Sequence, residues 1–350
     1  MGSSPPATTT NNPLPWVDVY RGIAILGVLV AHVGGRFLRE VPPDSEHWWL
    51  IATTNRLLAW VVPAFLFLST ILIGNSLLRN NQPYSWARLR PVVVPYLVWT
   101  GIYLLFRYFE GNLPPLTLER IGLYLLWGKS YFHLYYMVLA IQLVLLMPLL
   151  LPVLRRRVPA WLVLLVSIGL TLAFYWANRL YWQVPFPGST LIWYLPTLAV
   201  GLTLVKQMHG LEQIVRRYRA WGLVVLGLGM SLYLPLAYDA IRNIPVNTFQ
   251  YQTGYWIYSS AVSFVLISVA IWLSRTPLSA ALQFLGRYSL HIYLLHPLVI
   301  RVLERTPHFP EALGVSPAFT IYVALSLLIP LAVGILARWL RASRFLFGRA

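Results

Sequence analysis

Long apolar runs separated by short polar segments make up most of the chain. Runs of nearly 20 mostly apolar residues recur from the first quarter to the last, and a helix of that length crosses a bilayer. Strand-like alternation of apolar and polar residues is absent, which argues against a membrane barrel. The pattern predicts an all-α, multi-pass integral membrane bundle of about ten transmembrane helices, at 17–35, 57–77, 91–109, 132–154, 160–177, 190–206, 220–237, 255–273, 286–303 and 317–340.

Composition supports a membrane protein and excludes several other classes. The 350 residues are 58% hydrophobic and only 11% charged, against about 25% charged in soluble domains. The net charge of +17 comes mostly from short loops between the expected spans, so we expect no nucleic-acid partner. The chain has no cysteine, which excludes disulfides, thiolate metal ligands and a cysteine nucleophile.

The positive residues also predict the orientation of the bundle. Sixteen Lys and Arg residues fall in loops on the side of the two termini, and ten fall in the opposite loops. Because positive residues favour cytoplasmic loops, both termini are expected in the cytoplasm and residues 107–131 outside, with a short amphipathic helix in 113–130. The expected organisation is a disordered tail at 1–15, a membrane domain at 16–341 and a second tail at 342–350.

The stretch VYRGIAILGVLVAH, residues 19–32, places two ionisable side chains in the first apolar run. Arg21 and His32 are eleven residues apart, which on a helix is three turns plus about 20° and a rise of roughly 16 Å. They therefore share one face, and Asp18 lies one turn before Arg21. Each residue alone also fits a structural role, Arg21 as a snorkelling anchor and His32 as a helix-end residue. Together they suggest a base for a hydroxyl and a site for phosphate or carboxylate.

Four further stretches follow in a fixed order: VVPAFLFLST (61–70), RLRPVVVPY (88–96), HLYYMVLAIQLVLLMP (133–148) and GRYSLHIYLLHPLVI (286–300). With Asp18, Arg21 and His32, they resemble the motifs of the acyltransferase 3 family of membrane O-acyltransferases. Thr70 stands where that family commonly has glycine. The chain is loosely most similar to the intercellular-adhesin type, which modifies poly-N-acetylglucosamine.

The resemblance implies a membrane enzyme that transfers an acyl group. The donor would be cytoplasmic acetyl-CoA or succinyl-CoA, and the acceptor a hydroxyl of a surface glycan or lipid-linked sugar outside a bacterial plasma membrane. His32 would remove the hydroxyl proton or carry the acyl group itself, and Arg21 with Asp18 would hold the donor or fix the helix. Arg88 and Arg90 would contact the phosphates of coenzyme A.

Other polar residues in the spans are candidates for substrate binding. They are Ser69, Tyr136 and His296, although interhelical packing also explains such residues. No metal is expected, because no HxxxH or carboxylate-rich set occurs. A transporter or exporter of the same glycan, without acyl transfer, is the alternative. Asp18 is the only acid well inside an expected span, which argues against proton coupling but leaves a passive flippase open.

Overall fold

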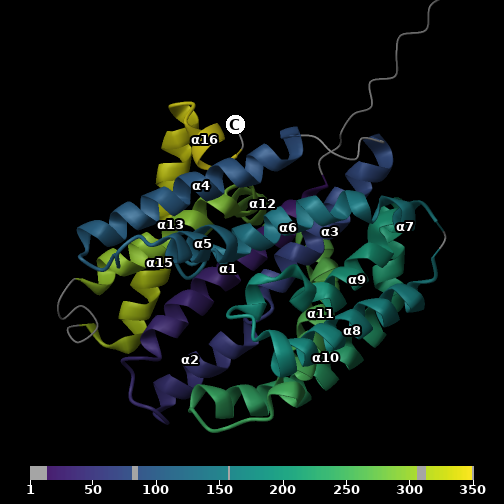
Figure 1. Ribbon diagram of the computed structural model, residues 1–350, viewed down its shortest axis with the longest axis horizontal. Coiled ribbons are helices and arrows are strands. Elements are labelled where there is room, and N and C mark those ends of the chain that lie inside the picture. The colour runs from purple at the N-terminus through teal and green to yellow at the C-terminus, as the bar shows by residue number, and fades with distance from the viewer. Residues whose placement is uncertain (1–13, 81–85, 157, 306–312, 349–350) are drawn as a thin grey trace, which may run out of the picture.

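The computed structural model describes residues 14–80, 86–156, 158–305 and 313–348, and within them the chain is helical, without strands (Figure 1). Most of the expected tail 1–15 and the last two residues lie outside this part. The α-helices are α1 Pro15–Phe37, α2 Glu46–Leu57, α3 Val61–Asn80, α4 Trp86–Phe109, α5 Leu118–Trp127, α6 Tyr135–Leu149, α7 Leu151–Arg155, α8 Ala160–Ala177, α9 Leu195–Leu204, α10 Leu211–Ile241, α11 Thr248–Leu273, α12 Ser279–Arg287, α13 Ser289–Glu304, α15 Val315–Trp339 and α16 Ser343–Leu346. A π-helical turn at Asn178–Trp182 follows α8, and 3₁₀ turns at Pro187–Ser189, Leu191–Tyr194 and Val205–Gly210 flank α9.

Eight described helical stretches are long and apolar enough to cross a membrane: Pro15–Phe37, Glu46–Arg79, Ala87–Phe109, Ala160–Trp182, Leu191–Met208, Leu211–Ile241, Thr248–Leu273 and Val315–Trp339. The two other expected spans, 132–154 and 286–303, coincide with the shorter helices α6 and α13. The prediction of an all-α, multi-pass membrane bundle is therefore confirmed.

The second expected span, 57–77, corresponds to α3, and a separate helix, α2, precedes it. The apolar pattern did not predict this additional helix. The chain breaks between α2 and α3 at residues 58–60. A continuous helix would need an N–H at residue 63 to bond the Ala59 carbonyl, and Pro63 has none. The hydroxyl of Tyr255 in α11 donates to that carbonyl instead, at 3.3 Å. The break thus follows from one proline and is stabilised from a neighbouring helix.

Helix α1 runs through the middle of the bundle (Figure 1). It contacts α2, α3, α11, α12, α13 and α15, and Val19, Ala24, Ile25 and Leu29 on it are fully buried. We name the two ends of the bundle the Pro15 side and the Phe37 side, after the first and last residues of α1. Because α1 extends from the Pro15 side to the Phe37 side and contacts six other helices, its residues connect sites at the two ends of the bundle.

A loop at residues 128–134 follows the short amphipathic helix α5. Thr117 caps α5 by accepting a bond from the Arg120 N–H at 3.3 Å, and Gly128 ends it with φ of +67°. A Cβ at Gly128 would lie 2.6 Å from the backbone nitrogen of Tyr135. Only glycine therefore fits the turn that brings the loop against the start of α6.

Candidate active site

Two glycines bring the start of α1 into backbone contact with α12. A Cβ at Gly286 would lie 1.9 Å from the Asp18 carbonyl oxygen, and one at Gly22 would lie 2.2 Å from the Leu282 carbonyl oxygen. The helices approach this closely because neither glycine has a side chain. This contact fixes the part of α1 that carries the ion pair of Arg21 with Asp18, whose N···O distance is 3.3 Å.

A cavity of about 460 Å³ lies on the Pro15 side of the bundle. Most of its wall is apolar and comes from α3, α4, α6 and α13. Within the described lining, the charged residues are Arg21, Arg88 and Arg287. No Asp or Glu belongs to the described lining. The cavity therefore suits a ligand that combines a long apolar part with an anionic end.

The candidates around this cavity separate into two groups. Arg88 lines the cavity and donates to the Ser76 hydroxyl at 3.3 Å. Ser69 and Tyr136 line it as well. Arg90, two residues along α4 from Arg88, is exposed and does not belong to the lining. The structure thus brings Arg21, Arg88, Ser69 and Tyr136 together and leaves Arg90 apart.

His32 pairs with His296, 264 residues further along the chain. The Nδ1 atom of His296 lies 2.9 Å from the Ile292 carbonyl oxygen. A carbonyl only accepts, so this nitrogen carries the proton and the Nε2 of a neutral His296 is an acceptor. The Nδ1–H of His32 donates to it at 2.7 Å. The Nε2 of His32 is then left with a lone pair, which is the arrangement that a general base requires.

A second cavity, of about 310 Å³, lies on the Phe37 side and includes His32 in its wall. Tyr131 and Phe132 of the 128–134 loop line it together with ionisable residues from α1, α4 and α13. Burial and the nearby Glu110 carboxylate raise the pKa of Tyr131 above its ordinary value, so this phenol stays neutral at physiological pH. Among the residues that the structure describes, none lines both cavities.

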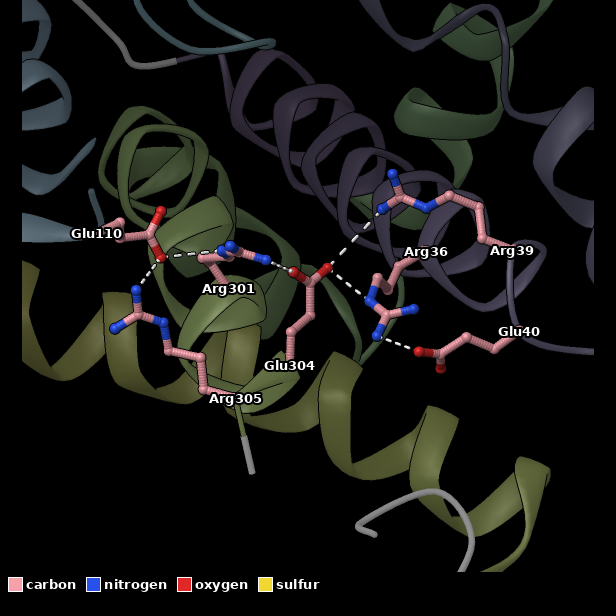
Figure 2. A network of polar contacts seen from close by, with 7 residues as sticks. All are labelled: Arg36, Arg39, Glu40, Glu110, Arg301, Glu304 and Arg305. Carbon is pink, nitrogen blue, oxygen red and sulfur yellow. Dashed lines mark hydrogen bonds and ion pairs between the residues drawn. The ribbon is translucent and has the colours of Figure 1, made fainter. Parts of the chain in front are cut away.

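A network of arginines and carboxylates borders the Phe37-side cavity (Figure 2). Glu304 lies 2.6 Å from Arg36 and 2.9 Å from Arg301, and Glu110 lies 3.0 Å from Arg301 and 2.6 Å from Arg305. The Glu110 side chain is only 4% exposed. A buried carboxylate requires such partners, so the network fixes the ends of α1, α4 and α13 around His32.

A family model described as an acyltransferase domain, that of the acyltransferase 3 family, matches residues 14–335. The chain belongs to the acyltransferase 3 family. It is therefore a membrane acyltransferase. Helix α1 and most of the described lining of the two cavities lie within the matched region, and Phe347 and Gly348 of the Pro15-side cavity lie beyond it. No curated protein and no solved structure matches the chain.

His133 of this acyltransferase stands between the two cavities and was not singled out from the sequence. Its side chain is fully buried, and neither ring nitrogen has a hydrogen-bond partner within the described residues. The ring centroid of His133 lies 5.2 Å from that of Tyr293 and 5.8 Å from that of His296. Tyr293 and Tyr136 pack with their centroids 5.1 Å apart at the inner end of the Pro15-side cavity. We call Tyr136, Tyr293 and His133 the aromatic wall.

The acid–arginine network of the acyltransferase was also missed, because its arginines were interpreted only as loop charges. One signal was present in the sequence. Arg36 follows His32 by four residues, so these two side chains lie near one face of α1. Arg301 follows His296 by five residues, about 140° around the helix, and gave no such signal. Glu110 gave no comparable signal, because only tertiary packing brings α4 to this point.

Proposed function

We propose that this acyltransferase moves an acetyl or succinyl group from acyl-CoA on the cytoplasmic side to a hydroxyl of a surface glycan or lipid-linked sugar outside. The donor would bind in the Pro15-side cavity and the acceptor in the Phe37-side cavity. The observation that carries the proposal is that one helix, α1, contributes Arg21 to the first cavity and His32 to the second.

The charge of the Pro15-side cavity supports its role as the donor site. Coenzyme A is a polyanion with a long flexible arm, and the cavity combines Arg21, Arg88 and Arg287 with largely apolar walls. Arginine forms forked, charge-assisted bonds with phosphate. The cavity thus offers positive charge for the phosphates and apolar surface for the arm and the acyl group.

The tautomer of His32 supports its role as the base. In the proposed step, the Nε2 lone pair of His32 takes the proton of the acceptor hydroxyl. The arm of coenzyme A would extend past the aromatic wall, so that the thioester carbonyl reaches the acceptor at His32. The oxygen attacks the thioester carbonyl carbon, the new C–O bond forms and the C–S bond breaks. The proton then passes from His32 to the leaving thiolate. His296, which accepts the other ring proton, stabilises the charged imidazole during this step.

The test uses purified protein in nanodiscs and follows acetyl-CoA consumption through the released thiol. General base catalysis contributes about 10²- to 10⁴-fold, so His32→Ala is expected to lose activity by that factor. His47→Ala is the matched control, because His47 is an exposed histidine on α2 outside both cavities.

A folded His32→Ala protein that consumed acetyl-CoA at the wild-type rate would exclude His32 as the base. A wild-type protein that moved glycan across vesicles without consuming acetyl-CoA would favour the transporter.

A further inference from the structure

The charges that line the Phe37-side cavity do not balance. Four arginines, Arg36, Arg39, Arg107 and Arg301, face two carboxylates, Glu110 and Glu304. Four positive charges and two negative charges leave a net charge of +2 in the described lining. A cavity with that surplus attracts anions and disfavours cations.

Both carboxylates are already committed to other arginines. Glu304 binds Arg36 and Arg301 at 2.6 and 2.9 Å, and Glu110 binds Arg301 and Arg305 at 3.0 and 2.6 Å (Figure 2). The side chains of Arg36 and Glu304 are only 14% and 13% exposed. Glu40 also pairs with Arg36. Three carboxylates therefore neutralise Arg36, Arg301 and Arg305, and the surplus charge belongs to the two remaining arginines.

Arg39 and Arg107 carry that surplus. The nearest described carboxylate to Arg39 is Glu304, at 3.8 Å, the longest ion pair of the network. The Arg39 side chain is 72% exposed. Arg107 has no carboxylate within 4.0 Å in the part of the chain that the structure describes, and donates only to the backbone oxygens of Asn112 and Ser130, at 3.2 and 3.4 Å.

We propose that the Phe37-side cavity binds an anionic group of the acceptor, a carboxylate or a phosphate, through Arg39 and Arg107. The inference rests on the proposed function, because it takes this cavity as the acceptor site. A sugar acid and the phosphate of a lipid-linked sugar share the required chemistry. The planar carboxylate and the tetrahedral phosphate each present two or more anionic oxygens to the guanidinium fork. The anion would orient the sugar so that one hydroxyl lies at His32, which lines the same cavity.

The test measures binding by calorimetry in nanodiscs of neutral phosphatidylcholine. The probes are methyl glucuronide and glucose 1-phosphate, each compared with uncharged methyl glucoside. One charge-assisted contact corresponds to about a 10- to 100-fold difference in affinity. We expect at least one charged probe to bind tighter than methyl glucoside by that factor, and Arg39→Gln or Arg107→Gln to reduce the difference.

Arg120→Gln is the matched control, because Arg120 on α5 does not belong to the cavity lining. It removes one positive charge from the same side of the bundle, and it should keep the preference for the charged probe. Equal affinity for charged and neutral probes would overturn the proposal. A preference that survived in the Arg39→Gln/Arg107→Gln double variant would also overturn it.

Nanodiscs containing phosphatidylglycerol separate two sources of phosphate. If this lipid abolishes binding of the charged sugars, the anionic group belongs to a lipid headgroup and the assignment to the acceptor is wrong. Binding of the charged sugars that is undiminished by this lipid supports the assignment of the anionic group to the acceptor. Because binding is read without acyl transfer, a failure of the proposed function appears separately, as an absence of acetyl-CoA consumption.

Discussion

Replacing His296 with alanine tests whether the histidine pair controls catalysis through His32. His296 is fully buried and accepts the Nδ1–H of His32 at 2.7 Å. Its removal takes away a hydrogen bond that becomes charge-assisted when His32 is protonated in the transition state, and such a bond is worth about 1.5–3 kcal/mol. This range corresponds to a rate loss of about 10- to 150-fold, toward the lower end of the loss expected for His32→Ala. The proton also becomes free to move to Nε2, where it would block the base.

The assay is again acetyl-CoA consumption in nanodiscs, with a conservative variant to distinguish positioning from packing. In His296→Gln the side-chain oxygen reaches the same region as Nε2 and accepts a hydrogen bond. We expect the activity order wild type, His296→Gln, His296→Ala, His32→Ala. His47→Ala controls for the loss of a histidine, and melting profiles establish that each variant is folded.

The double variant His32→Ala/His296→Ala gives the sharpest result. If His296 acts only through His32, its removal costs nothing further once His32 is absent, so the two losses are not additive. Additive losses would refute the positioning role. So would a His296→Gln variant that is as slow as His296→Ala.

Three further predictions follow from other contacts. A single cysteine at Asn112 should react with an impermeant thiol reagent from outside the cell and one at Gln213 only from the cytoplasmic side, and the reverse pattern would contradict the orientation. Arg88→Gln should raise the KM for acetyl-CoA about 10- to 100-fold. Arg90 is exposed and outside the cavity lining, so Arg90→Gln should raise the KM less, and equal effects would argue against the Pro15-side cavity as the donor site. Gly286→Ala should cost about 1–3 kcal/mol and lower the melting temperature, because its Cβ would meet the Asp18 carbonyl oxygen, whereas Gly227→Ala meets nothing within 4 Å and should melt as the wild type does.

The helices were predictable because each span is encoded locally, in a run of apolar residues long enough to cross a bilayer. The link between Arg21 and His32 was predictable for the same reason. Their separation of eleven residues fixes both their common face and their distance along α1. Helical periodicity also distinguishes Arg88 from Arg90, since two residues correspond to about 200°, so only one of them faces the cavity.

The partners of these residues were not predictable, because they come from distant parts of the chain. His296 was a candidate for substrate binding, but its bond to His32 depends on how α13 packs on α1. In the sequence, Glu110 and Glu304 have the pattern of loop charges. Their ion pairs with arginines depend on how the ends of α4 and α13 pack together. His133 lay inside a quoted motif, but its importance depends on two ring nitrogens without partners in the described structure, which no sequence pattern reveals.

In the proposed orientation, the aromatic wall would also determine where a membrane voltage falls across this protein. With the donor and acceptor cavities open to opposite sides, Tyr136, Tyr293 and His133 would form the layer between them, and most of the potential would drop over a short distance there. Each elementary charge that crosses the full potential gains or loses about 2.3 kcal/mol per 100 mV. A neutral acetyl group crosses without electrical work. In the proposed orientation, a succinyl group carries its negative charge outward, and an inside-negative potential would drive that transfer forward.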